Sequence, residues 1–180
     1  RLLDEVDLAD WRPYLRWRIL NSFTGLLSEE TVQASFEFYG KVLRGVPQMR
    51  PRWKRGVDLV EGMVGEALGQ EYVGRHFPPE NKARMVELVD NLLAAFEVSI
   101  DGLAWMTEQT KQEAHGKLKR FTAKIGYPEV WKDYSDMDLV PGQLIASVRA
   151  AREWHHDYEV NKLGGPVDRH EWHMNPQTVN

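Results

Sequence analysis

Apolar residues along this 180-residue chain recur mainly three and four positions apart, the spacing that places side chains on one face of an α-helix. A stripe of this kind covers residues 32–43, and a longer one of about five turns covers residues 85–103. Strict alternation of apolar and polar residues, typical of strands, is nearly absent, and only Thr178 and Val179 favour a strand locally. The pattern predicts an all-α fold of about five to seven helices that ends in a short extended segment.

Residues that start and stop helices divide this pattern into six expected helices. Their starts are expected after Asp7 or Asp10, after Ser28, near Pro51, at Pro79, after Thr107 and at Pro141. The last helix should reach about Leu163, where Gly164, Gly165 and Pro166 stop it.

The third expected helix, residues 51–77, is unusual because it contains five glycines. These are Gly56, Gly62, Gly65, Gly69 and Gly74. Each costs roughly 0.5–1 kcal/mol relative to alanine inside a helix, so the helix could be weak or broken. Alternatively, the Gly65-x-x-x-Gly69 face could allow close packing against another helix, since small residues bring backbones together.

Composition narrows the possible functions. The net charge of −4 argues against a nucleic-acid partner, and the absence of cysteine excludes disulfides and thiolate metal sites. No apolar run approaches the roughly 20 residues of a membrane span. The compartment stays open between the bacterial cytoplasm and the cell envelope, because the chain starts at Arg1 and an anchor or signal could precede it.

The six histidines do not predict a zinc site. His170 and His173 flank Glu171-Trp172, but a zincin helix needs two histidines four residues apart, and these are three apart. The adjacent pair His155–His156 would point about 100° apart on a helix. A weak surface site from Glu153, His156 and Asp157 is the remaining metal candidate. We therefore expect no catalytic metal ligand in this chain.

A basic cluster, Arg50–Arg55, surrounds Trp53 at the expected start of the third helix. Positive charge is unfavourable there, because the helix macrodipole prefers acidic groups at its N-terminus. The cluster therefore indicates either internal ion pairs with an acidic partner or a site for an anionic ligand. No glycine-rich phosphate loop, nucleophile elbow or carboxylate pair accompanies it.

Eight short blocks, in order, give the chain a family resemblance. They are Phe36–Gly40, Arg52–Arg55, Gly65–Val73, His76–Phe77, Leu103–Met106, Lys124–Pro128, Trp131–Ser135 and Pro166–Arg169. Together they resemble the neprilysin-type zinc metallopeptidases, which include endothelin-converting enzymes and bacterial members. The lack of the cysteines found in animal members points to a bacterial relative.

The resemblance implies a two-lobed zinc endopeptidase whose central chamber admits peptides and small polypeptides. Residues 1–164 would form the helical capping lobe, and residues 165–180 would begin a truncated catalytic lobe. The zinc motif His-Glu-x-x-His would follow Asn180, which matches the family asparagine that binds the substrate backbone. This chain would then bind no zinc and be inactive without the missing lobe.

Two other classes of function compete with this interpretation. One is a helical protein-interaction or scaffold module with no catalytic role. The other is a small metal-binding protein that uses its histidines.

Overall fold

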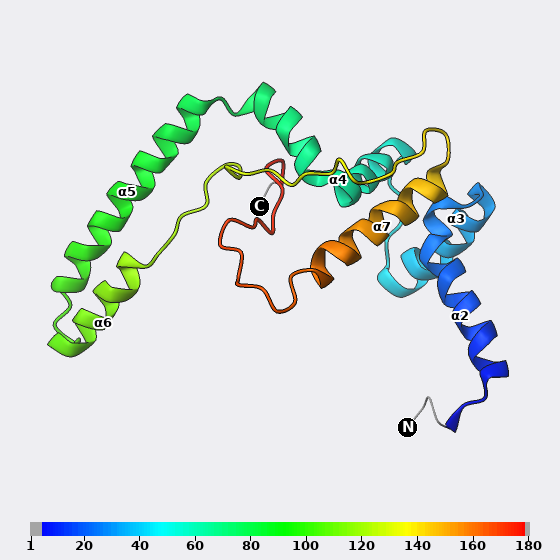
Figure 1. Cartoon of the computed structure of the whole chain (residues 1–180), viewed down its shortest axis with the longest axis horizontal. Helices are drawn as coiled ribbons and strands as arrows, with labels where there is room; N and C mark the ends of the chain where they lie inside the picture. The colour runs from blue at the N-terminus through cyan, green and yellow to red at the C-terminus, as the bar shows by residue number, and fades with distance from the viewer. Residues whose placement is uncertain (1–4, 179–180) are drawn as a thin grey trace. The chain divides into compact units, whose positions relative to one another are not determined.

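The computed structural model describes residues 5–178, and these residues are helical in most of their length, with no strand among them. The helices are α2 (Leu8–Phe23), α3 (Glu29–Ser35), α4 (Arg52–His76), α5 (Pro79–Asp101), α6 (Glu108–Lys119) and α7 (Leu144–Val160), with a 3-10 turn η1 (Thr24–Leu26) and a π-helical segment η2 (Phe36–Val42). Figure 1 shows α5 and α6 as an antiparallel hairpin, followed by a long irregular connection. The predicted all-α fold is confirmed.

The predicted caps explain where several helices begin. Asp7, Ser28 and Thr107 each accept a hydrogen bond from a backbone N–H two or three residues further on, at 3.2, 3.4 and 3.2 Å. Pro79 occupies the first turn of α5, where its missing N–H costs nothing. Pro13 lies inside α2 rather than at its start.

The predicted start of the last helix at Pro141 is wrong by three residues. Gly142 adopts a φ of +77°, which a right-handed helix cannot contain. Pro141 and Gly142 therefore form a turn, and α7 begins at Leu144. Ser147 secures this turn, because its hydroxyl lies 3.1 Å from both the N–H and the carbonyl oxygen of Val140.

The chain divides into two compact units, and the division falls inside α4. The first contains the residues up to Met63 together with Ser135–Leu163, and the second contains Val64–Tyr134 together with the residues from Gly164 onward. Val64 has φ −137° and ψ 45°, so it interrupts the helix at this boundary. Of the two alternatives for the glycine-rich helix, the break is therefore present.

Side chains satisfy backbone carbonyls on both sides of this break. The Met63 carbonyl oxygen lies 2.9 Å from Nε2 of His155, within the first unit. The Gly65 carbonyl accepts a hydrogen bond of 3.2 Å from Nε2 of Gln177, within the second. A helix break exposes carbonyls that need partners, and here histidine and glutamine supply them.

The first unit has a small core. Its buried apolar residues are Val32, Met137, Val148 and Ala151. Arg152 joins α7 to α2, because its guanidinium donates to the Ser22 carbonyl at 3.1 Å and lies 4.4 Å from the Phe23 ring centre. This single side chain combines a hydrogen bond with a cation–π contact.

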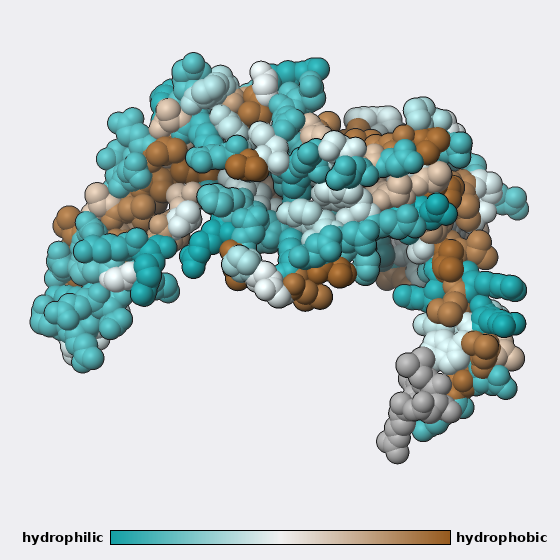
Figure 2. Space-filling model, viewed as in Figure 1, coloured by the Kyte–Doolittle hydropathy of each residue, from teal (hydrophilic) through white to brown (hydrophobic). Residues whose placement is uncertain are grey.

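Much apolar surface stays exposed. On α5, Leu88, Leu92 and Phe96 are 54%, 50% and 50% exposed, and Figure 2 shows apolar side chains at the surface along this helix. The accessible surface is 14372 Å², whereas two separate compact bodies of half this mass would expose about 10,800 Å². Within residues 5–178, no helix is both long and apolar enough to cross a membrane.

We therefore expect the 180-residue chain, produced alone, to bind an environment-sensitive hydrophobic dye or to self-associate. Apolar patches of this extent normally contact another protein surface. Dye fluorescence and analytical ultracentrifugation measure the two outcomes. A monomer that binds no dye would contradict the expectation.

Candidate functional site

The segment that leads to Asn180 lies against the second half of α4. Gln177 donates to the Gly65 carbonyl, and the Asn175 side chain lies directly over the Gly65 Cα. Pro176 covers Gly69, where an added Cβ would lie 2.8 Å from the proline Cδ. A turn closes the segment, because the Thr178 N–H donates to the Asn175 carbonyl at 3.0 Å.

This contact explains the small residues of the Gly65-x-x-x-Gly69 face and corrects one prediction. The two glycines are buried, as close packing requires. Their neighbour, however, is the turn segment Asn175–Gln177 rather than a second helix. Spacing identifies a face that admits close approach, but it carries no information on which part of the chain approaches.

Glu66 anchors the long connection to the same stretch of α4. It is 4% exposed and is the buried charged residue of the described chain. Its Oε2 accepts a hydrogen bond of 2.8 Å from the Lys132 backbone N–H, and its Oε1 lies 3.3 Å from Lys132 Nζ. One side chain therefore satisfies both a backbone donor and an ammonium group.

The block Lys124–Pro128 forms the other contact of the connection. Gly126 has a φ of +74°, and a Cβ there would collide with the Phe77 ring, so glycine is required on two grounds. The Tyr127 ring packs edge-on against Phe77 and stacks on Trp131 at 5.9 Å. Lys82 adds a cation–π contact at 4.0 Å and donates to the Tyr127 carbonyl at 3.0 Å.

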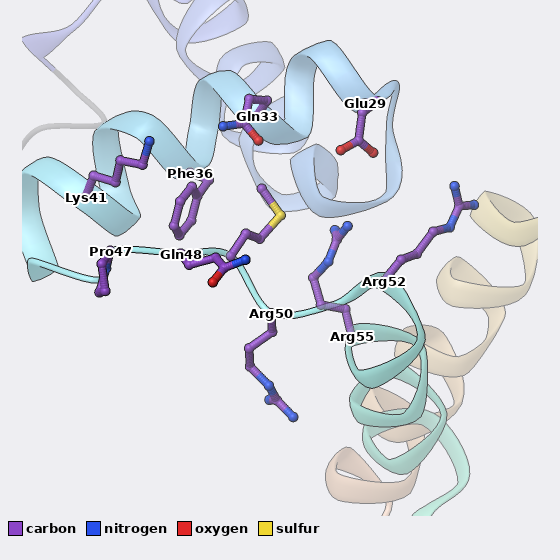
Figure 3. Close-up of a pocket in the computed structure, with 10 residues that line it drawn as sticks. Glu29, Gln33, Phe36, Lys41, Pro47, Gln48, Arg50, Arg52 and Arg55 are labelled. Atoms are coloured by element: carbon purple, nitrogen blue, oxygen red, sulfur yellow. The ribbon is translucent and has the colours of Figure 1, made fainter.

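The basic cluster Arg50–Arg55 lies beside a cavity in the first unit. Arg50 is paired with Asp58 through two hydrogen bonds of 2.5 and 3.2 Å. Arg50, Arg52 and Arg55 all line a cavity of about 370 Å³ between η2 and the start of α4. Figure 3 shows the Arg55 side chain extending from the first turn of α4 towards α3, Arg52 extending to one side of it, and Arg50 pointing in the opposite direction from Arg55.

Comparison with known proteins identifies this arrangement. The family model for the N-terminal region of peptidase family M13 matches residues 1–128, which is more than half of the chain.

The chain belongs to peptidase family M13.

Similar M13 proteins come from animals and bacteria. Neprilysin-2 of Drosophila melanogaster is 32% identical and matches 93% of this chain and 24% of its own length. Neutral endopeptidase of Lactobacillus helveticus is 29% identical, with 96% and 27% of the two chains covered. The chain thus spans about a quarter of the length of these relatives.

A solved structure is more similar. The crystal structure of Mycobacterium tuberculosis zinc metalloprotease Zmp1 in complex with an inhibitor is 48% identical, with a TM-score of 0.86. It covers 99% of this chain and 27% of its own. A structure of a partially open state of the same metalloprotease has a TM-score of 0.82 at 49% identity.

The M13 resemblance assigns substrate binding to Asn180, which lies outside the described residues. Among the described residues that precede it, Asn175, Pro176 and Gln177 all contact α4. The role of Asn180 stays a prediction. So does the division at residue 164 into two lobes.

The residues present do not fit a zinc site of this M13 protein. Within residues 5–178, no three histidine or carboxylate side chains are grouped so that they could hold a metal ion. The histidines have other contacts: His155 faces the Met63 carbonyl, and His115 Nε2 lies 2.8 Å from Asp101 Oδ1. In the His170–His173 segment, the His170 N–H donates to Asp168 Oδ1 at 2.8 Å.

Sequence reasoning missed two residues that organise this part of the M13 chain. Glu66 looks like any surface glutamate of a polar helix, and His155 looks like one of two adjacent exposed histidines. Their partners, Lys132 and Met63, lie 66 and 92 positions away. The glycines beside Glu66 were the available signal, since they mark the face of α4 that other segments approach.

Proposed function

We propose that the whole protein is a bacterial zinc-dependent endopeptidase that cleaves peptides and small polypeptides. The observation that carries this proposal is the 48% identity to the Mycobacterium tuberculosis zinc metalloprotease across 99% of this chain. In this proposal, residues 1–164 form the helical lobe that restricts substrate access. Residues 165–180 begin the catalytic lobe, and the zinc ligands lie further along the gene.

The residues of this chain would then help to position the substrate and would not take part in bond cleavage. The contacts of Asn175, Pro176 and Gln177 with α4 would hold the backbone that precedes Asn180. An amide side chain can donate to and accept from a bound peptide backbone, whose hydrogen bonds give affinity without sequence preference. No metal-dependent step is assigned to this chain.

The test compares two purified proteins: the product of the complete gene and the 180-residue chain. We expect the complete protein to contain zinc and cleave a fluorogenic peptide, and a chelator to abolish the cleavage. The chain alone should cleave nothing. A complete protein that lacks zinc and peptidase activity would overturn the proposal and favour the scaffold alternative.

The role of Asn180 gives a sharper prediction. In the complete protein, Asn180→Ala should lower kcat/KM for peptides about 5- to 150-fold, since one or two hydrogen bonds contribute about 1–3 kcal/mol. Zinc content and melting temperature should stay unchanged, because the residue is expected to touch substrate and not metal. Thr178→Ala, at the exposed residue that closes the Asn175–Thr178 turn, is the control and should retain activity.

A further inference from the structure

Two sequence blocks to which the proposed peptidase function assigns no role line one cavity of the first unit. Phe36 and Lys41, from the π-helical segment η2, form one wall, and Arg52 and Arg55, from the first turn of α4, form another. Gln33 of α3 lines the cavity on the same side as Phe36, as Figure 3 shows, and its amide donates to Glu37 Oε1 at 2.7 Å. π-Helical segments are rare and occur frequently at functional sites.

The positive charges at this cavity are only partly balanced. Lys41 Nζ donates to Glu37 Oε1 at 2.6 Å, and this hydrogen bond holds the pKa of Glu37 below its usual value. Arg50 is likewise neutralised by Asp58. Arg52 and Arg55 have no carboxylate partner at ion-pair distance within the described chain.

Among these residues, Arg55 gives the strongest indication of a missing hydrogen-bond acceptor. Its Nε is buried and has no hydrogen-bond partner among the described residues. A buried guanidinium N–H without an acceptor costs free energy comparable to a lost charge-assisted hydrogen bond. Arg55 also lines a second cavity, of about 470 Å³, which Arg44 shares. Guanidinium groups from two elements therefore surround adjoining space.

The position of these arginines on α4 adds a second, independent argument. They occupy the first turn of the helix, where the macrodipole already places about half a positive charge. Two further positive charges are unfavourable at that end unless an anion offsets them. Backbone N–H groups of the first turn add donors that lack partners within the helix.

We propose that this cavity binds an oxyanion, a carboxylate or a phosphate group, between Arg52 and Arg55. Planar guanidinium groups bind both kinds of oxyanion through paired hydrogen bonds. The volume of about 370 Å³ exceeds the space that a bare ion needs, so the oxyanion can be part of a larger ligand. The site is separate from the residues assigned to peptide binding and does not depend on peptidase activity.

Glu29 carries a negative charge at this cavity, so removing that charge should change the affinity for an oxyanion in a direction that the proposal predicts. Its carboxylate lines the same cavity and would repel a bound oxyanion. Glu29→Gln should therefore strengthen oxyanion binding about threefold, as a like charge several ångströms away in a solvated site predicts. A purely structural role for the cluster predicts no gain from this substitution.

The experiment titrates the complete protein with inorganic phosphate and, separately, with N-acetyl-aspartate amide, by isothermal calorimetry and thermal shift. We expect millimolar or tighter binding of at least one probe. Arg55→Gln and Arg52→Gln should each weaken it about tenfold or more, the loss of a charge-assisted hydrogen bond. The two probes distinguish a phosphate ligand from a carboxylate ligand.

Arg75→Gln is the matched control, because Arg75 lies in the last turn of α4 and pairs with Glu71. It should leave binding unchanged. If Arg55→Gln proves unstable, Arg52→Gln decides, since Arg52 is exposed. Failure of both probes to bind, or equal binding by the arginine variants and the control, would overturn the proposal and indicate that another part of the protein fills the cavity.

Discussion

Lys132→Met should lower the free energy of unfolding of this chain by about 3 kcal/mol, the lower end of the range for breaking a buried ion pair. Glu66 is 4% exposed, and Lys132 Nζ lies 3.3 Å from its carboxylate. Without the ammonium group, the carboxylate stays buried and keeps the hydrogen bond from the backbone N–H of residue 132. Urea denaturation followed by circular dichroism measures the change.

The control pair lies on the same helix. Arg75 and Glu71 are 74% and 73% exposed, and Arg75→Met should cost less than about 1 kcal/mol, as surface ion pairs do. In addition, Glu66→Gln combined with Lys132→Met should recover most of the loss, because a neutral amide can still accept from the Lys132 N–H. Equal small losses at both pairs would contradict the assignment of Glu66 as a buried anchor.

The helices could be predicted from sequence because their signals are local. Apolar spacing located the six α-helices of the described residues, α2 to α7, and Asp7, Ser28, Pro79 and Thr107 marked starts that the structure reproduces. The start of α7 was misplaced because Pro141 favours a helix start equally well as a turn, and the φ of Gly142 decides between them. Local signals therefore predict helices better than their ends.

The contacts between helices and connections could not be predicted in the same way. Glu66 with Lys132 and Gly65 with Gln177 join residues 66 and 112 positions apart. Nothing in the spacing of either partner encodes the other, because burial of a polar residue depends on which segment covers it. Resemblance to a family supplied only a predicted role for Asn180, whereas the structure supplied the contacts of the residues that precede it.

The basic cluster Arg50–Arg55 could be predicted in part: sequence located it but did not determine its partners. Sequence left two alternatives for Arg50–Arg55, internal ion pairs or an anionic ligand. All three arginines line one cavity, but Arg50 forms an ion pair with Asp58, whereas Arg52 and Arg55 have no carboxylate at ion-pair distance among the described residues. Arg50 thus fits the first alternative, and an anionic ligand stays a proposal for Arg52 and Arg55. Sequence could not separate these residues, because the acidic partner of Arg50 lies eight positions away.

Gly69→Leu should lower the free energy of unfolding by about 1–3 kcal/mol through overpacking. A Cβ at this position would lie 2.8 Å from Cδ and 3.1 Å from Cγ of Pro176, whose ring cannot rotate away. The control is Gly74→Leu in the same helix, where a Cβ meets no atom within 4 Å. That variant should gain about 0.5–1 kcal/mol from helix propensity. Because the helical gain is common to both, the difference between the variants measures the contact with Pro176.

The same pair of variants links stability to function. If the leucine at position 69 displaces Pro176, the segment that precedes Asn180 moves with it, and a displacement of about 1 Å can cost 10²-fold in rate. In the complete protein, Gly69→Leu should therefore reduce peptide cleavage well below that of Gly74→Leu at equal zinc content. Pro176→Ala should restore part of the lost stability, since it removes the ring atoms that collide. If both leucine variants unfold at the same urea concentration, the turn segment Asn175–Gln177 does not pack on α4 in solution.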